Sequence, residues 1–360
     1  MKNIFYLLAF ITFFSCTKTK TEFIEVEVDK KYSWKEVPGF TGNDRIFLSS
    51  GGNADALYFQ QPYGFSEVKG TAINKITIYD ADFSTEISTR IPISPNFSAH
   101  LVKERDTLLF LFNNKYPIEN TRAVQLNLKS IDPTLVSVKK NYNTYRSKSM
   151  EINKNGTLIL SYANNNAENP YTLLLINMKT ANNYPNIQTV FTKKVAIPRL
   201  SPVYSEISAI IPIDDYFIVN CFRDGIYKVK EDGTFRKIME YGDITTIYKH
   251  GNNVYMHDNY LNKVLISSDN SENWQQYNIS SEFQIRGKYS VIKDSLVAIR
   301  EGSLFTLKWN GTSYTQRFLK NDGFESTQIN GIEILKDTVY VATTSGLYAK
   351  PVSTFFDTKK

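Results

Sequence analysis

Short runs of apolar and β-branched residues recur along the chain, each preceded by a polar turn. The clearest pairs begin at residue 215: residues 215–222 with 225–230, 253–258 with 263–267, 294–300 with 303–309, and 337–344 with 346–350. Runs rich in Val, Ile, Tyr and Phe and bounded by polar turn residues are typical of β-strands joined as hairpins. Outside the first sixteen residues no stretch shows a sustained 3.6-residue apolar period. The sequence therefore predicts an all-β fold with few helices.

The polar turn returns at similar intervals along the whole chain. It begins at residues 55, 106, 155, 215, 253, 294 and 337, so successive turns lie 51, 49, 60, 38, 41 and 43 residues apart. A four-stranded blade of a β-propeller takes about 40 to 50 residues. This spacing predicts a seven-bladed β-propeller of four-stranded blades. A two-domain β-sandwich protein would show similar strands, but it gives no reason for the near-constant spacing after residue 215.

Further apolar runs supply the other strands of these blades. Runs before the turns predict innermost strands at 207–213, 244–248, 289–292 and 329–335, and runs after the second strand predict outer strands at 235–239, 274–279 and 314–319. After Tyr348 the last blade has little chain left for an outer strand, whereas the strand-like run 31–37 lacks a partner. We expect this N-terminal strand to complete the last blade and close the ring, because closure removes an open sheet edge.

The first residues have the pattern of an export signal. Lys2 supplies a positive charge, and residues 4–14 form an apolar run too short to span a bilayer comfortably. The run ends in Phe13-Phe14-Ser15-Cys16, which resembles the lipobox of bacterial lipoproteins, although that family usually has Leu in place of Phe13. The resemblance implies a signal peptide over residues 1–15 and lipidation of Cys16. A plain secretory peptide with a coincidental cysteine is the alternative.

Lipidation would anchor the protein to a membrane. Two or more acyl chains give durable anchoring where one gives only marginal binding. Residues 16–29 would form a tether, whose polar part 17–29 reaches at most about 45 Å when fully extended. Residues 30–360 would form a single propeller domain. We therefore expect the protein in the cell envelope, held on a bacterial membrane and facing the periplasm or the cell exterior; the sequence does not distinguish the membranes or their leaflets.

One turn carries a recognisable motif. Residues 267–274 (SSDNSENW) resemble the Asp box of sialidase-type propellers, Ser-x-Asp-x-Gly-x-Thr-Trp, with Ser267, Asp269 and Trp274 in place and with other residues at the Gly and Thr positions. In such a turn the Asp carboxylate caps backbone N–H groups and the Trp packs between blades. In that family the box is structural and lies away from the active face. The resemblance thus implies a fold and no activity.

The catalytic residues of the sialidase class cannot be assembled from this sequence. That class needs three arginines to clamp a carboxylate, a Tyr–Glu nucleophile pair and an acid. Its early Phe/Tyr-Arg-Ile-Pro segment occurs here only inverted, as Ile197-Pro198-Arg199. We assign no catalytic residue. The alternative, a propeller glycoside hydrolase or lyase, would draw its pair of carboxylates from separate blades.

Candidate binding residues lie in four long connections. By analogy with other propellers, ligands bind where the loops between second and third strands and the crossings between blades meet. The loops between second and third strands are long at 61–74, 113–122 and 163–171, and the crossing between blades at 197–204 is extended. Their aromatic, amide and arginine side chains suit stacking on sugar rings or anchoring a protein. The candidates are Tyr63, Phe65, Tyr116, Arg122, Asn164, Asn166, Tyr171 and Arg199.

Three turns resemble the Asp-Ser/Thr-aliphatic acceptor of O-glycans on exported proteins of Bacteroidetes-like bacteria. They are Asp106-Thr107-Leu108, Asp294-Ser295-Leu296 and Asp337-Thr338-Val339. The resemblance implies glycans on Thr107, Ser295 and Thr338, all on one face. An ordinary turn, in which Asp begins the turn and Ser or Thr begins the next strand, explains the same residues equally well.

Composition and charge narrow the classes of function. The 360 residues are 42% hydrophobic and include 23 Tyr and 23 Phe, as in an aromatic-rich globular protein. The net charge of +6 is spread along the chain, which disfavours nucleic-acid binding. Two cysteines and three histidines exclude a disulfide framework and a Cys/His zinc site. Cys221 lies in a strand-like run and is expected to be a buried, inert thiol. No cofactor is expected, although backbone carbonyls could hold calcium without a motif.

These observations favour a binding function over a reaction. We expect a lipid-anchored, extracytoplasmic propeller that acts as a non-catalytic binding or scaffold module, with a glycan or an envelope protein as its ligand. The propeller enzyme remains the alternative, and a purely structural envelope protein is a third possibility. An enzyme requires converging carboxylates with a perturbed pKa, whereas a binder needs only an aromatic-lined patch.

Overall fold

The computed structural model divides the chain into two compact units, Met1–Tyr32 and Ser33–Lys360. It describes residues 32–52, 56–62, 64–77, 97–103, 107–112, 123–127, 150–161, 171–180, 187–200, 207–240, 244–258, 262–279, 288–300, 302–324 and 327–359. Several predicted features lie outside these residues, namely the signal peptide, Cys16, the tether, Tyr63, Tyr116, Arg122, Asn164 and Asn166. The fold below is that of the second unit.

Strands that follow one another along the chain pair in antiparallel sheets. In the first half, one sheet contains β2 (Ser49–Gly52), β3 (Leu57–Gln61), β4 (Gly64–Lys69) and β5 (Ala72–Thr77). A three-stranded sheet contains β6 (Phe97–Lys103), β7 (Thr107–Phe112) and β8 (Ala123–Asn127). The next contains β9 (Met150–Ile152), β10 (Thr157–Ser161), β11 (Tyr171–Thr180) and β12 (Ile187–Ile197).

The second half repeats this arrangement with four strands in each sheet. One sheet contains β13 (Ile207–Ile213), β14 (Tyr216–Cys221), β15 (Gly225–Lys230) and β16 (Phe235–Met239). Another contains β17 (Ile244–His250), β18 (Asn253–Asp258), β19 (Lys263–Ser267) and β20 (Gln275–Asn278). A third contains β21 (Lys288–Ile292), β22 (Ser295–Arg300), β23 (Ser303–Trp309) and β24 (Tyr314–Phe318). The last contains β25 (Ile329–Leu335), β26 (Thr338–Thr343), β27 (Leu347–Pro351) and β1 (Lys35–Glu36).

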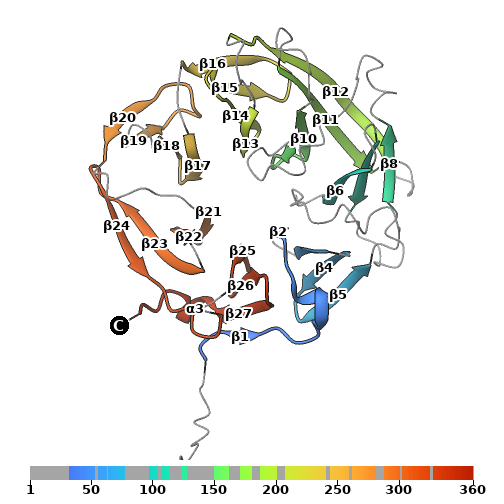
Figure 1. Ribbon diagram of the computed structural model, residues 1–360, viewed down its shortest axis with the longest axis vertical. Helices are drawn as coiled ribbons and strands as arrows, with labels where there is room; N and C mark the ends of the chain where they lie inside the picture. The colour runs from blue at the N-terminus through green and yellow to red at the C-terminus, as the bar shows by residue number, and fades with distance from the viewer. Residues whose placement is uncertain are drawn as a thin grey trace, which may run out of the picture. The chain divides into compact units, whose positions relative to one another are not determined.

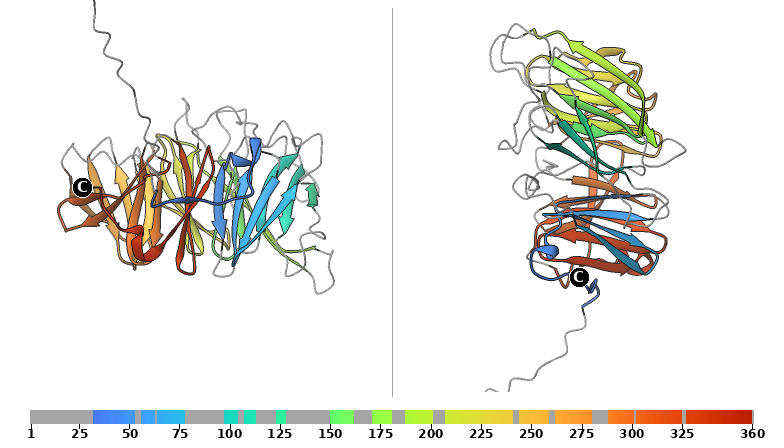
Figure 2. Two further views of the ribbon diagram at one scale, coloured as in Figure 1. Left: turned by 90° about the horizontal axis from the view of Figure 1, so that it is seen from below. Right: turned by 90° about the vertical axis from the view of Figure 1, so that its right-hand side faces the viewer.

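The first strands of neighbouring sheets lie next to one another. Contacts link β9 with β13, β13 with β17, β17 with β21, β21 with β25, and β25 with β2. Figure 1 shows these strands on the inside of the unit and the last strands, such as β16, β20 and β24, on the outside. In the side view of Figure 2, strands of neighbouring sheets run between the same two ends. The unit is thus an all-β fold with the arrangement of a β-propeller, in which six of the described sheets have four strands.

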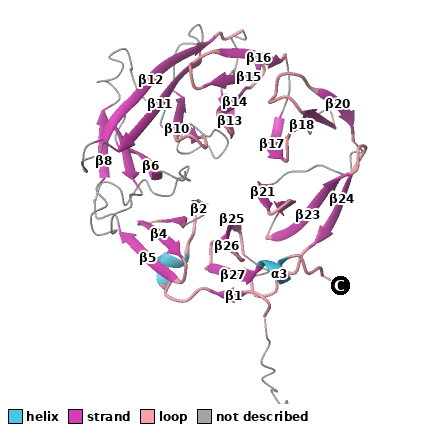
Figure 3. Cartoon of the chain, turned by 180° about the vertical axis from the view of Figure 1, so that it is seen from behind, coloured by secondary structure: helices cyan, strands magenta, loops and turns pink. Residues whose placement is uncertain are grey.

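Helix is scarce, as the sequence predicts. Among the described residues it is confined to the 3-10 helix η1 (Gly42–Arg45) and the one-turn helix α3 (Val352–Phe355) (Figure 3). No helix in this part of the chain is long and apolar enough to cross a membrane.

The strands of the second half match their predicted positions. The predicted limits are observed at 207–213, 225–230, 235–239, 253–258, 263–267, 303–309 and 329–335, and the other predicted runs differ from the observed strands by one or two residues at their ends. The second and third strands of a sheet, such as β14 and β15, are readable in sequence because they have buried apolar residues on both faces, which pack against the sheets on either side. Phe217 and Val219, for example, pack with Ile159 and Leu173 of the preceding sheet. The outer strands β16 and β20 are more exposed.

The N-terminal segment forms the outer strand of the last sheet, the pairing expected from the sequence. Lys35 pairs with Ala349 and Glu36 with Tyr348. Trp34, 2% exposed, packs edge-on against Phe324 and Phe355, and its indole N–H donates a hydrogen bond of 2.8 Å to the carbonyl of Lys320. A short strand is therefore held chiefly by a buried aromatic residue beside it.

One loop prediction is wrong. Residues 61–74 were expected as a long loop, but most of them form β4 and the start of β5, and β3 leads into β4 through a short turn. Phe65, a candidate binding residue, therefore lies on a strand, where it pairs with Gln60 and Ile76. The polar residues of β4 obscured the strand, because Ser66 and Glu67 are buried in place of apolar residues. Ser66 donates a hydrogen bond of 2.6 Å to Gln61, and Glu67 accepts one of 3.0 Å from the Tyr58 hydroxyl.

Candidate functional site

Turns alternate between the two ends of an antiparallel sheet whose strands follow in chain order. One end of the sheets carries the turns between second and third strands and the crossings from one sheet to the next. We call it the crossing end, and residues 198–200 and 222–224 lie there. The opposite end, which carries the turns between first and second and between third and fourth strands, is the hairpin end; residues 214–215 and 268–274 lie there. A polar cluster that joins two sheets lies at each end.

Two candidate binding residues come together at the crossing end. Tyr171 is the first residue of β11, and Arg199 follows the end of β12, its neighbour in the sheet. The guanidinium carbon of Arg199 lies 4.7 Å from the centre of the Tyr171 ring. This is the geometry of a cation–π contact, which favours arginine stacked on the ring face. The Tyr171 side chain is buried, whereas Arg199 is half-buried.

The next sheet supplies a carboxylate to this pair. Asp224 lies in the turn between β14 and β15, and its Oδ2 accepts a hydrogen bond of 2.6 Å from the Tyr171 hydroxyl. Asp224 is 1% exposed, and its backbone carbonyl accepts a bond of 3.3 Å from the Tyr227 hydroxyl. Buried carboxylates persist when they are hydrogen-bonded. The Tyr171–Asp224 bond therefore joins two sheets below the surface of the crossing end.

The turn that holds Asp224 depends on the glycine that follows it. Gly225 has φ = 113°, and a Cβ atom there would lie 2.4 Å from Lys237 Cε and 2.5 Å from the Met239 carbonyl oxygen. Only glycine fits both the backbone angle and the space. Sequence reasoning missed Asp224, although Asp-Gly is a strong turn signal, because the turn is short and candidates were sought in long loops.

Exposed residues surround this buried pair. Leu200, next to Arg199, is 63% exposed, the largest value for a large apolar side chain among the described residues. Arg223 precedes Asp224 and is exposed, and its guanidinium carbon lies 5.3 Å from the ring centre of half-buried Phe222. Arg223 also has φ = 68°, a left-handed conformation that costs a non-glycine residue about 1 to 3 kcal/mol and is frequent at functional sites. We call Arg199, Leu200, Phe222 and Arg223 the arginine patch.

Cys221 lies beneath the patch and is not reactive. It is buried, and burial raises the pKa of its thiol far above the ordinary value; Asp224 raises it further, whereas Arg199 and Lys237 lower it. A thiol in this state does not form the nucleophilic thiolate at neutral pH. This agrees with its prediction as an inert buried residue.

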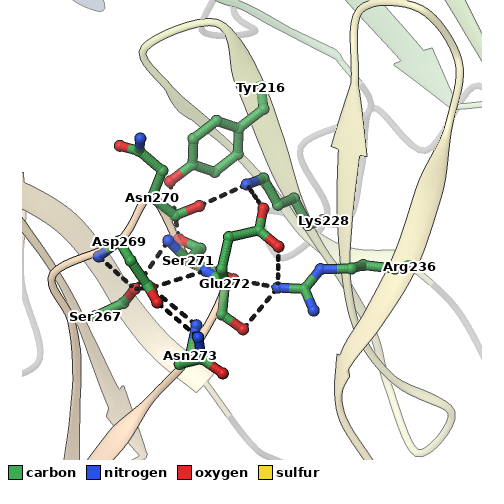
Figure 4. Close-up of polar contacts among 9 residues, drawn as sticks. All are labelled: Tyr216, Lys228, Arg236, Ser267, Asp269, Asn270, Ser271, Glu272 and Asn273. Carbon is green, nitrogen blue, oxygen red and sulfur yellow. Dashed lines mark hydrogen bonds and ion pairs between the residues drawn. The ribbon is translucent and has the colours of Figure 1, made fainter.

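The turn with the Asp-box pattern lies at the hairpin end (Figure 4). Asp269 Oδ1 accepts backbone N–H bonds from Glu272 at 3.1 Å and from Asn273 at 2.8 Å, and a bond of 2.8 Å from the Ser267 hydroxyl. These bonds hold the pKa of Asp269 at about 2. Trp274 packs against the cluster formed by the strands of its own and the preceding sheet. The carboxylate thus caps the backbone N–H groups of the turn.

The same turn is tied to the preceding sheet. The Lys228 ammonium donates to the Asn270 carbonyl and to Glu272, and Arg236 donates to the carbonyls of Ser271 and Glu272 at 2.9 and 2.7 Å (Figure 4). The Tyr216 hydroxyl lies 2.8 Å from Ser271 Oγ, and Lys228 Nζ lies 4.3 Å above the Tyr216 ring. This cluster joins two sheets through contacts made within the chain.

The three candidate glycosylation residues occupy equivalent positions. Thr107, Ser295 and Thr338 each begin the second strand of their sheet, at the hairpin end. The side chains of Ser295 and Thr338 are half-buried. Glycans on these residues would thus lie at the end opposite the arginine patch.

Two further titratable groups were not singled out as sites. Glu333, on the inner strand β25, accepts a hydrogen bond of 2.8 Å from the Ser50 hydroxyl of β2, and burial raises its pKa to about 7. His257 is fully buried between two tyrosine hydroxyls, each 3.3 Å from Nε2, and burial lowers its pKa to about 4. His257 is therefore neutral and out of reach of a substrate. The described residues contain no group of three or more His, Cys, Asp or Glu side chains able to hold a metal ion.

Comparisons with known proteins identify the fold. No protein-family model matches the chain, and no curated protein sequence matches it. A solved streptogramin B lyase is 10% identical, with a TM-score of 0.54 over 88% of this chain and 97% of that one. YCF48 bound to D1 peptide is 13% identical, with a TM-score of 0.51 over 89% and 97%. The extracellular domain of the putative hybrid two component system BT4673 from B. thetaiotaomicron is 11% identical, with a TM-score of 0.51 over 92% and 44%. These structures are β-propellers, and at such low identity the likeness extends to the fold alone.

Proposed function

We propose that this protein is a lipid-anchored, extracytoplasmic propeller of seven four-stranded blades, closed by its N-terminal strand, that binds a glycan or an envelope protein without transforming it. The observation that carries the binding function is the arginine patch above the Tyr171–Asp224 bond. Arginine is enriched among the residues that carry most of the binding energy at protein interfaces. A fold shared with a peptide-bound propeller is compatible with this role.

The anchor and the glycans are part of the same proposal. Cys16 would carry the acyl chains, and residues 17–29 would hold the propeller clear of the headgroups. Glycans on Thr107, Ser295 and Thr338 would cover the hairpin end and leave the crossing end open. Mass spectrometry of the protein from its native membrane tests both points. An unmodified Cys16 peptide would contradict the anchor, and unmodified peptides around the three residues would contradict the glycans.

The binding function can be tested on the full chain in detergent micelles. A ligand that binds only the folded state raises the melting temperature. We expect an envelope oligosaccharide or a solubilised envelope protein fraction to give a saturable rise, which Arg199→Gln reduces. Arg317→Gln is the matched control, because Arg317 is an exposed arginine on β24 of another sheet. No shift with any fraction, or equal loss in both variants, would contradict the proposal.

An enzymatic role is the second candidate, and Glu333 is the observation that favours it. A carboxyl group with a pKa near neutrality on an inner strand suits a general acid. Its pKa is set by burial and by Ser50, with no second acidic side chain contributing, whereas glycoside hydrolysis requires two carboxyl groups. Turnover of any ligand found above, abolished by Glu333→Gln with binding retained, would favour the enzyme.

A further inference from the structure

The charge of the arginine patch points outward. Asp224, the nearest acidic side chain in sequence, is buried and bonded to Tyr171, and Glu240 pairs with Lys237. Arg223 makes no ion pair with any described residue and is exposed. These two acidic groups are thus turned inward or paired, and the exposed guanidinium group of Arg223 gives the rim a positive charge. A ligand of negative charge would complement it.

Both guanidinium groups are held in place before a ligand arrives. Arg199 lies 4.7 Å from the ring centre of Tyr171, and Arg223 lies 5.3 Å from that of Phe222. Ordering a flexible side chain on binding costs conformational entropy, and this stacking reduces that cost. A planar guanidinium pairs with a carboxylate through two parallel hydrogen bonds. The arrangement therefore suits carboxylate groups.

The same stacking disfavours sugar rings. A sugar binds an aromatic residue through an open ring face. Here the Tyr171 ring is buried and covered by Arg199, and the Phe222 ring is covered by Arg223. The group left open is Leu200, an exposed apolar side chain whose burial by a ligand is favourable. An apolar group beside a carboxylate is the chemistry of a protein segment.

We infer that the arginine patch binds an acidic segment of a partner protein, with carboxylates on Arg199 and Arg223 and an apolar side chain on Leu200. This inference rests on the proposed binding function and chooses between its two ligand classes. The partner is defined by its chemistry: aspartate or glutamate residues beside an apolar residue.

Site-specific photo-crosslinking in the producing bacterium tests the inference. The full chain carries p-benzoylphenylalanine in place of Leu200, and the same residue in place of Phe318, which is exposed on β24, serves as the control. We expect position 200, and not position 318, to cross-link to one segment that contains Asp or Glu. Arg199→Gln and Arg223→Gln should each reduce the yield about tenfold, the loss typical of a binding hot spot, whereas Arg317→Gln should not.

A synthetic peptide of the cross-linked segment then isolates the charge. Fluorescence anisotropy compares this peptide with a version in which Asn and Gln replace Asp and Glu, and we expect the amide version to bind at least about tenfold more weakly. Equal binding would overturn the inference. So would cross-linking to a neutral or basic segment, to a glycan or to a second copy of the chain, or the absence of any cross-link.

The outcomes separate this inference from the proposed function. If the full chain shows saturable binding in the melting assay but the arginine variants keep the cross-link, the binding function stands and the assignment to the patch fails. If no glycan or protein fraction binds the full chain, both fail.

Discussion

Two clusters in this protein are built on the same plan. In each, a buried tyrosine hydroxyl reaches a polar group of the next sheet, and a cation lies over the tyrosine ring. At the crossing end Tyr171 bonds Asp224 under Arg199; at the hairpin end Tyr216 bonds Ser271 under Lys228. The two cations lie 4.7 and 4.3 Å from their rings. Similar contacts thus join sheets at both ends.

The clusters differ in what surrounds the cation. The Lys228 side chain is 4% exposed and meets Glu272 and the Asn270 carbonyl, so its charge is balanced inside the chain. Arg199 is half-buried and borders exposed Leu200. An internally balanced cation stabilises the fold, whereas a cation at an exposed apolar rim can meet a ligand. Both clusters share the contact between a cation and a tyrosine ring. The groups around the cation, rather than that contact, distinguish a structural cluster from a binding one.

The largest expected effect comes from another contact between sheets, the hydrogen bond between Ser50 and Glu333. The pKa of Glu333, about 7, exceeds the ordinary 4.5, so the folded state binds the proton more tightly. This contribution to stability is complete below pH 4.5 and is lost as pH rises through 7. It corresponds to about 3 kcal/mol of unfolding free energy. Urea unfolding of the full chain at pH 5 and pH 8 should show this loss, and Glu333→Gln should remove it; the same loss in the variant would refute the assignment.

The next largest loss of stability should come from removing the ammonium group of Lys228, whose charge is balanced within the chain. Lys228→Met deletes hydrogen bonds from a buried charged group and should lower the unfolding free energy by about 2 kcal/mol without affecting ligand capture. Arg199→Gln should weaken capture strongly and lower the unfolding free energy by less than Lys228→Met does, by about 1 kcal/mol, because the cation–π contact with Tyr171 is lost. Urea unfolding and partner capture measured on both variants provide the check. If Arg199→Gln lowered the unfolding free energy as much as Lys228→Met, the distinction between a binding cluster and a structural cluster would be contradicted.

The two tyrosines should differ by a smaller amount. Tyr171→Phe deprives a buried carboxylate of a donor and should cost about 2 kcal/mol, whereas Tyr216→Phe deprives a serine hydroxyl and should cost about 1 kcal/mol. Melting temperatures and urea midpoints of both variants measure the difference. The opposite order would show that Asp224 is held mainly by other contacts.

The smallest effect should come from the turn cap. Hydrogen bonds lower the pKa of Asp269 to about 2 from an ordinary 3.8, so its stabilising contribution exists above pH 3.8 and is lost as pH falls through 2. Asp269→Asn should therefore lower the melting temperature slightly at pH 6 and not at pH 2. A variant as stable as the natural protein at pH 6 would show that the cap contributes nothing.

The strands of the second half could be predicted because local pattern decides them. Residues 207–213 and 329–335 are apolar runs bounded by turns, and both sheet faces are covered by neighbours. The strands within 61–74 were missed because their polar side chains carry no such pattern. For the same reason Phe65 was expected on a loop, whereas it lies on β4.

The site was only half visible in the sequence. Tyr171 and Arg199 could be named from residue type and from the long connections that carry them. Asp224 could not, because its role depends on a turn of the next sheet, 53 residues away in sequence from Tyr171. Burial of Glu333 where β25 contacts β2 raises its pKa. These two strands lie far apart in sequence, so a local sequence pattern does not specify their contact.

The most direct test of the difference between the two ends is hydrogen exchange. The full chain, purified with its partner from the native envelope, is compared with the same chain after a high-salt wash, which weakens contacts between exposed charges. Amides covered by a partner exchange more slowly. The account predicts slower exchange in the bound state at residues 198–200 and 222–225 and no change at 268–274. Protection at 268–274, or at neither segment, would contradict it.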